Sequence, residues 1–66
     1  MSIEKGNLVR IVSGDEFDGQ IGKVVNIQID YHRGESYRAV FVRTQYNGVV
    51  SYLEDDVSKI HAVGVK

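Results

Sequence analysis

Few side chains in this 66-residue chain could carry out acid–base or nucleophilic chemistry, because it has two histidines and no cysteine. Nucleophilic catalysis needs a serine or cysteine beside a base that a third group orients. The candidate bases, His32 and His61, lie far apart in the chain, and no serine in a strained elbow accompanies either. We therefore expect both histidines at the surface. We predict that the protein is not an enzyme, with no catalytic residue and no cofactor.

Carboxylates gather in two places, which raises the question of a metal site. Asp15, Glu16 and Asp18 share the loop 13–19, and Glu54, Asp55 and Asp56 are consecutive. The first group lacks the alternating ligands, central glycine and terminal glutamate of a calcium loop. The second group is consecutive, so its side chains cannot all converge in an extended chain, and the histidine spacing does not predict a metal site. We predict a solvated acidic loop, an acidic turn that starts at Glu54, and no metal.

Tyrosine and arginine in the second half of the chain are better suited to binding. Both residue types are enriched in the parts of protein interfaces that contribute most affinity, and both can stack on or hold nucleic-acid groups. The alternative is that tyrosines on the strands complete the edge of the core with their hydroxyls in water. The sequence predicts one partner-binding face, formed by Tyr37, Arg38, Arg43, Tyr46 and Tyr52.

Charge and composition limit the classes of partner. Eight basic and nine acidic side chains give a formal charge of −1, so a nucleic-acid contact would need a local basic patch. The absence of cysteine fits a reducing cytosol. The chain has neither a signal-like apolar segment nor an apolar run of about 18 residues. We expect a cytoplasmic protein with no membrane contact.

The elements that must position these side chains are β-strands. Sixty-six residues are enough for one domain, 1–66, in which we expect residues 1–5 and 64–66 to be flexible and Ile3 to dock on the core. Val24–Asp30 alternates strictly, with Val25, Ile27 and Ile29 on one face. The predicted strands are Leu8–Val12, Gln20–Ile29, Tyr37–Thr44, Val49–Leu53 and Ser58–Val63.

The connections between these strands define the predicted fold. Phe17 should be a lid on one end of the core, and Gly34 should bend the polar hairpin tip 31–36. Asn47-Gly48 predicts a type I′ turn, and Glu54–Val57 a single 3₁₀ turn. The sequence therefore predicts an all-β, five-stranded SH3-like barrel with a long first loop and a 3₁₀ turn before the last strand. A five-stranded OB-type barrel is the structural alternative.

The opening strand-loop-strand segment resembles a KOW motif, as found in NusG-type transcription elongation factors and several ribosomal proteins. The residues that carry the resemblance are Val9, Arg10, Ile11, Gly14, Gly19, Gly22 and Val24. It implies a small SH3-like barrel whose first loop meets RNA or a protein. In this chain that loop is acidic, with Asp18 where the family usually has a basic residue.

The loop spacing is also similar to that of the type II dihydrofolate reductases, which are tetramers with folate and NADPH in a central pore. The matching residues are Gly6, Val9, Arg10, Ser13, Gly14, Gly19, Gln20 and Ile21. Ile11 stands at the position of the pore lysine, and Val49-Val50-Ser51-Tyr52 at that of the Val-Gln-Ile-Tyr pore motif. This resemblance implies an oligomeric reductase as an alternative function.

The sequence predicts a small non-catalytic interaction module that docks on a protein or ribonucleoprotein partner, as a monomer or weak homo-oligomer. The alternatives are the reductase-like enzyme and a KOW domain that binds RNA or DNA directly. A steep fall of affinity with salt would identify the last of these.

Overall fold

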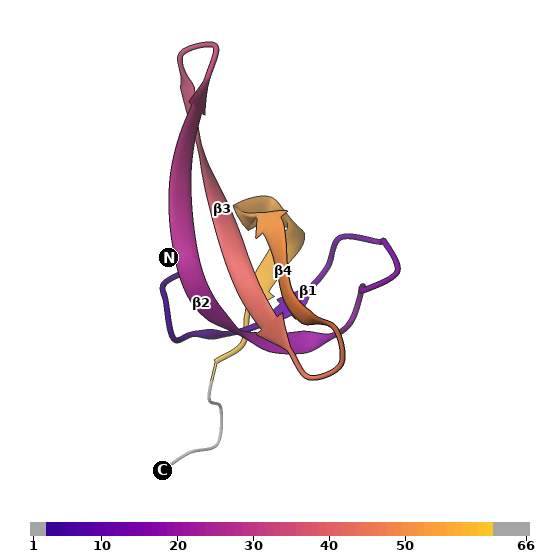
Figure 1. The fold of residues 1–66 in the computed structure, drawn as a ribbon. Helices are drawn as coiled ribbons and strands as arrows, with labels where there is room; N and C mark the ends of the chain where they lie inside the picture. The colour runs from indigo at the N-terminus through magenta and orange to yellow at the C-terminus, as the bar shows by residue number, and fades with distance from the viewer. Residues whose placement is uncertain (1–2, 62–66) are drawn as a thin grey trace.

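The computed structural model describes residues 3–61, which form an all-β structure without an α-helix, as predicted (Figure 1). Valine, isoleucine and aromatic residues dominate the strands, because branched and aromatic side chains pack well on a pleated surface. The elements are β1 (Leu8–Ile11), β2 (Ile21–His32), β3 (Glu35–Thr44), β4 (Gly48–Leu53), the 3₁₀ turn η1 (Glu54–Asp56) and β5 (Val57–Lys59).

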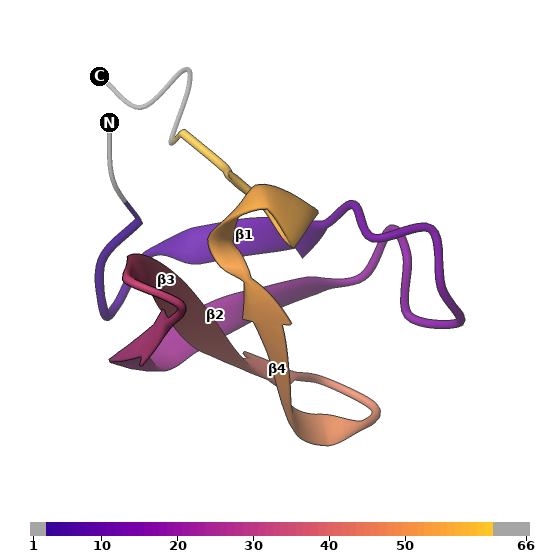
Figure 2. The ribbon, with the colours of Figure 1, turned by 90° about the horizontal axis from the view of Figure 1, so that it is seen from above.

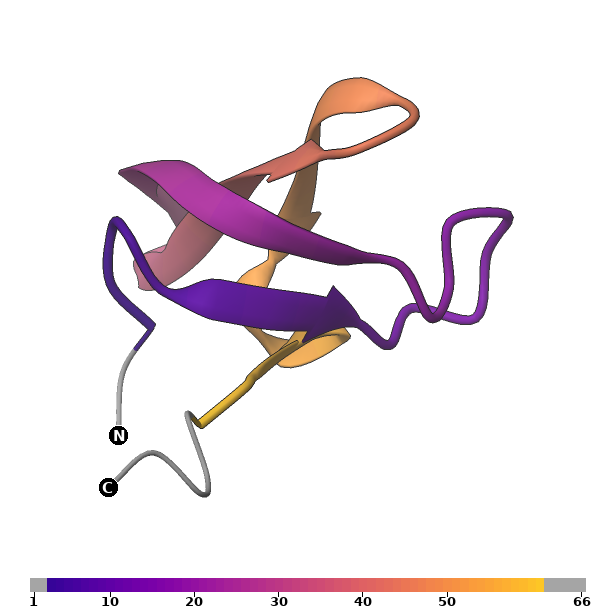
Figure 3. The same cartoon turned by 90° about the horizontal axis from the view of Figure 1, so that it is seen from below.

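The five strands form one antiparallel sheet in the order β4-β3-β2-β1-β5. The sheet curls, so that β4 runs across the direction of β1 and β2 and η1 arrives beside β1 (Figures 2 and 3). The amide of Val12 donates to the carbonyl of Asp56 at 2.9 Å where they meet. Among residues 3–61 no strand pairing joins β4 to β5, so the sheet is open there and the predicted closed barrel is not established.

The core lies on the concave face of the curled sheet and consists of β-branched residues. Its buried members are Ile3, Val9, Ile11, Val24, Val40, Val42 and Val57. Phe17 packs against this cluster from the first loop, which confirms its prediction as a lid. Ile3 is 4% exposed, which confirms that it docks.

The predicted alternation of β2 is interrupted by a β-bulge between Val24 and Asn26. Val24 faces the core before the bulge and Ile27 after it, whereas the sequence predicted Val25 on the same face as Ile27. A bulge adds one residue to one strand, so it shifts the side-chain alternation. Gly22 precedes it at a close approach of β2 to β3, where an added Cβ would lie 2.5 Å from the carbonyl oxygen of Arg43.

The β2–β3 hairpin bends at Gly34 as predicted, whereas the turn between β3 and β4 differs from its prediction. The two consecutive positive φ angles occur at Arg33 (51°) and Gly34 (80°), and β2 and β3 continue to this two-residue turn. The prediction of a type I′ turn at Asn47-Gly48 is wrong, because only Gly48 there has a positive φ. The hydroxyl of Thr44 instead accepts the amide of Asn47 at 3.0 Å and donates to the carbonyl of Gly48 at 3.1 Å.

The end of the chain agrees with the prediction in part. The 3₁₀ turn forms at Glu54–Asp56, and the last strand is shorter than predicted, with bounds Val57–Lys59. Positions 62–63 of the predicted strand, and residues 1–2 and 64–66 of the termini predicted to be flexible, lie outside the described residues. In the described part, no helix has the length and apolar character to cross a membrane.

Candidate functional site

The strand register separates the side chains of the sheet into a core face and an outward face. Val9, Val24 and Val42 point into the core. Because neighbouring residues of a strand alternate between faces, Lys23 and Arg43 point outward and are exposed. They are direct partners across β2 and β3, in an outward row that crosses four strands as Leu8, Lys23, Arg43 and Val49.

The structure does not place the five predicted site residues on one face. Tyr37 and Arg43 point outward from β3, and Tyr46 lies in the turn before β4 with 79% of its surface exposed. Arg38 and Tyr52 belong to the opposite face, because Arg38 is two residues before the buried Val40 on β3 and Tyr52 is the direct cross-strand partner of Val40. The predicted face is therefore split between the two sides of the sheet.

Arg38 connects the start of the chain to η1. Its Nε lies 3.2 Å from Oε2 of Glu54, and its guanidinium also donates to the carbonyl of Ile3. The same Glu54 oxygen accepts the amide of Ile3 at 3.4 Å. This half-buried pair holds Ile3 in the core, so the contacts of Arg38 are structural.

Tyr52 connects β4 to the first loop. Its hydroxyl donates to Oδ2 of Asp15 at 2.8 Å, while Oδ1 of Asp15 accepts the hydroxyl of Ser13 at 2.6 Å and the amide of Phe17 at 2.9 Å. These bonds, with that from Ser13 first, lower the pKa of Asp15. Desolvation and then the bond to Asp15 raise the pKa of Tyr52. Asp15 thus organises the loop, a role that the Ser-x-Asp spacing could have indicated.

A hollow of about 420 Å³ opens on the outward face beside the bulge. Hydrogen bonds from Gly6 N to Val24 O (2.8 Å) and from Val24 N to Asn7 O (2.9 Å) bring the residues before β1 to its rim. Among the described residues that line this hollow, three are basic and none is acidic. The lining residues are Lys5, Gly6, Lys23, Val24, Val25 and Arg43. Sequence reasoning missed Lys5 and Lys23, because only the register of β2 against β3 brings Lys23 to Arg43 and only the hydrogen bond from Gly6 to Val24 brings Lys5 there.

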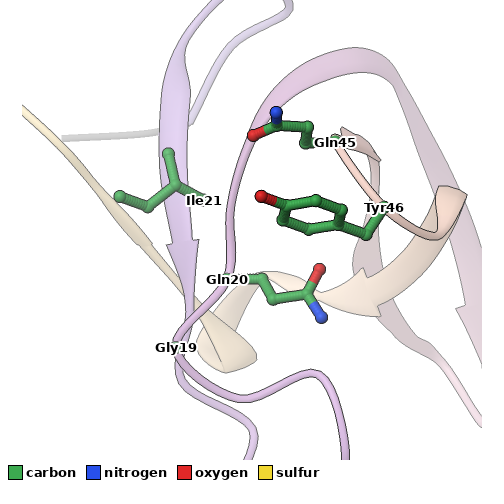
Figure 4. Close-up of a pocket in the computed structure, with 5 residues that line it drawn as sticks. All are labelled: Gly19, Gln20, Ile21, Gln45 and Tyr46. Carbon is green, nitrogen blue, oxygen red and sulfur yellow. The ribbon is translucent and has the colours of Figure 1, made fainter.

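A second hollow, of about 310 Å³, lies between the start of β2 and the turn before β4. It is lined by Gly19, Gln20, Ile21, Gln45 and Tyr46. The side chains of Gln20 and Gln45 lie on either side of the Tyr46 ring in Figure 4. Oε1 of Gln20 is buried and has no hydrogen-bond partner in the described part of the protein. A buried acceptor without a partner is costly, so this atom marks a place where a donor would bind favourably.

An apolar strip continues along the outward face of β3 and β4. Val49 is 49% and Leu53 50% exposed. Leu53 is the direct partner of the half-buried Ala39, and Val49 and Leu53 are the two diagonal neighbours of the half-buried Phe41, whose direct partner is Ser51. Tyr37 extends the strip toward the hairpin tip. Contiguous exposed apolar surface commonly marks a docking site.

The two histidines do not assemble a site with the carboxylates. His32 and His61 are both exposed, and the ring of His32 lies 6.5 Å from that of Tyr37 between centroids. Residues 3–61 contain no group of three or more histidine, aspartate or glutamate side chains able to hold a metal ion. What the geometry offers is a surface of cations, amides and apolar groups, which is suited to binding.

Comparisons with protein-family models, with curated proteins and with solved structures find no match for this chain. The family resemblances of the first loop therefore stay predictions.

Proposed function

We propose that the protein is a small non-catalytic interaction module that docks on a protein or ribonucleoprotein partner. The observation that carries the proposal is the outward face of β2, β3 and β4, where an apolar strip adjoins a group of cations. The strip consists of Tyr37, Ala39, Phe41, Val49 and Leu53. Aromatic, apolar and arginine side chains of this kind are the usual anchors of protein interfaces.

The proposal includes a finer description of the fold and its setting. The sheet is an SH3-like barrel of the KOW type in the cytoplasm. Three features support the fold: the long loop after β1, the 3₁₀ turn η1 between β4 and β5, and the return of β5 to pair with β1. The absence of cysteine supports the proposed cytoplasmic location, because the cytoplasm is reducing. Ile11, at the position of the reductases' pore lysine, is fully buried and so offers no group to a ligand.

The test compares two sets of variants that remove equally exposed apolar side chains. Val49→Ser with Leu53→Ser alters the strip, and Ile29→Ser, at a residue 52% exposed, alters the opposite face. Immobilised wild-type protein should retain specific host partners. The strip variant should lose them, and the Ile29 variant should keep them.

Two measurements make the outcome decisive. Thermal unfolding should show that the strip variant is folded, since both substituted side chains are half exposed. Sedimentation velocity should give a monomer or weak dimer, whereas a stable tetramer would favour the reductase-like alternative. Retention of the same partners by wild type and both variants would refute docking through the strip.

A further inference from the structure

We propose that the cationic end of the outward face binds the phosphate backbone of single-stranded nucleic acid, with an unstacked base in the neighbouring second hollow. We call this hollow the Tyr46 hollow, and it is lined by Gly19, Gln20, Ile21, Gln45 and Tyr46. This inference builds on the proposed docking function and names one class of partner for the same face. It concerns the cationic cluster, defined as Lys5, Arg10, Lys23 and Arg43.

The strand register brings Arg10, Lys23 and Arg43 together, and the hydrogen bond from Gly6 to Val24 brings Lys5 beside them. Lys23 and Arg43 are directly opposite each other, and both line the larger hollow with Lys5. Arg10 is the partner of Ile21 on β1 and β2, which makes it the diagonal neighbour of Lys23 on the same face. Diagonal neighbours on one face of a sheet are about 7–8 Å apart, within reach of long side chains.

The cationic cluster has no internal counterion. Like charges directly opposite each other destabilise a sheet. In the described part of the chain the one ion pair is Arg38–Glu54, so no carboxylate lies within 4.0 Å of a cluster nitrogen there. No ion pair within residues 3–61 offsets the repulsion between Lys23 and Arg43. A bound anion would offset it.

The acidic side chains on the outward face of β2 and β3 lie at the other end of the hairpin. Asp30 and Glu35 belong to the same face as Lys23, close to the hairpin tip, which extends beyond the rest of the molecule (Figure 1). Arg43 and Tyr37, the partners of Lys23 and Asp30, are six positions apart on β3, which is about 20 Å at ~3.3 Å per residue. That exceeds the Debye length of about 8 Å at physiological salt, so these acids screen the cluster little.

The Tyr46 hollow is what favours a nucleic acid over an acidic peptide. It adjoins the cluster, because Ile21 lines this hollow and Lys23 is the next outward residue of β2. It combines an exposed aromatic ring with two amides, and Oε1 of Gln20 lacks a donor. Aromatic rings stack on bases, and amides bond to base edges.

A single strand suits this arrangement better than a duplex. A base can enter a hollow only when it is free of its stack and its partner. The loop 13–19, whose last residue Gly19 lines the Tyr46 hollow, carries three acids that would repel phosphates. The strand should therefore run from Tyr46 across β2 and β3, away from that loop.

Fluorescence anisotropy with labelled 15-mer oligouridylate, oligothymidylate and a DNA duplex tests the proposal between about 50 and 300 mM NaCl. Both single strands should bind more tightly than the duplex. The slope of log K against log salt should be about −2 to −3, since each neutralised phosphate contributes about −0.7. The ratio between the two single strands reports whether the site distinguishes RNA from DNA.

Three variants locate the contacts. Lys23→Gln with Arg43→Gln should weaken binding at least tenfold at low salt and make the slope shallower by about 1.4, the contribution of two phosphates. Tyr46→Ala should weaken binding and leave the slope unchanged. The matched control, Arg33→Gln with Lys59→Gln, removes two cations elsewhere and should bind as wild type does. Removing like charges should not lower the melting temperature.

Several outcomes would overturn the proposal: no binding at 50 mM NaCl, a preference for duplex, equal weakening by the control, or a flat salt dependence. Tighter binding of a polyglutamate peptide or of phosphatidylserine vesicles would also refute it. The variant Val49→Ser with Leu53→Ser should still bind the oligonucleotides. If the oligonucleotides do not bind and this variant loses a nuclease-resistant host partner, the docking proposal stands and the nucleic-acid proposal fails.

Discussion

Reversing the charge of Arg43 should stabilise the protein while abolishing the cationic cluster. Arg43 is directly opposite Lys23 across β2 and β3, so Arg43→Glu changes a repulsive pair into an attractive one. Opposite charges in this position contribute roughly 0.2–1 kcal/mol, and like charges cost a similar amount. Removing the repulsion and adding the attraction together give roughly 0.4–2 kcal/mol. Because both side chains are exposed, we take a value below the middle of this range, about 1 kcal/mol.

The assay is thermal unfolding followed by circular dichroism at low and high salt. For a domain of this size about 1 kcal/mol corresponds to an increase of ~4–8 °C in the melting temperature. The increase should appear at about 20 mM NaCl and shrink strongly at 1 M, where the Debye length is about 3 Å. Oligonucleotide binding should be lost in the same variant.

The control for this prediction is Arg33→Glu at the tip of the β2–β3 hairpin, where the same charge is reversed away from Lys23. It should change the melting temperature by no more than about 2–4 °C in either direction, since surface substitutions are usually within about 0.5 kcal/mol. A lower melting temperature for Arg43→Glu, or an increase that is the same at both salt concentrations, would refute the unbalanced cationic pair.

Two further predictions concern the scaffold. Gly22→Ala should lower the free energy of unfolding by about 1–3 kcal/mol in urea, because the new Cβ would lie 2.5 Å from atoms of β3; an unchanged midpoint would contradict this close approach. The lowered pKa of Asp15 stabilises the fold above its unfolded value of about 3.8, and this contribution is lost as the pH falls through the folded pKa. The stability difference between wild type and Asp15→Asn should therefore narrow below about pH 4, and a constant difference down to pH 2 would refute the role of the carboxylate.

Local patterns in the sequence were sufficient for much of the fold. The five strands, the 3₁₀ turn at Glu54–Asp56 and the packing of Phe17 follow from residue type and short-range alternation. The turn at Asn47-Gly48 was predicted wrongly because the Thr44 side chain bonds to this loop and supports a longer connection. Side chains of this type compete with backbone turns in ways that a dipeptide rule ignores.

The candidate site was less predictable, for two different reasons. Arg38 and Arg43 are separated by an odd number of positions on β3, so period-two alternation already places them on opposite faces. The prediction of a shared face did not apply that rule. The pairing of Lys23 with Arg43 depends instead on the register of β2 against β3. No local pattern specifies that register.

The formal charge of −1 therefore describes the chain but not its surface. Charges separated by more than about 8 Å are largely screened from one another at physiological salt, so a partner responds to the local group and not to the total. Register assembles that local group, and Gly22 lies beside it where β2 closely approaches the backbone of Arg43. A larger residue at Gly22 would move Lys23 relative to Arg43. The close approach at Gly22 and the cationic cluster are consequently two results of the same pairing of β2 with β3.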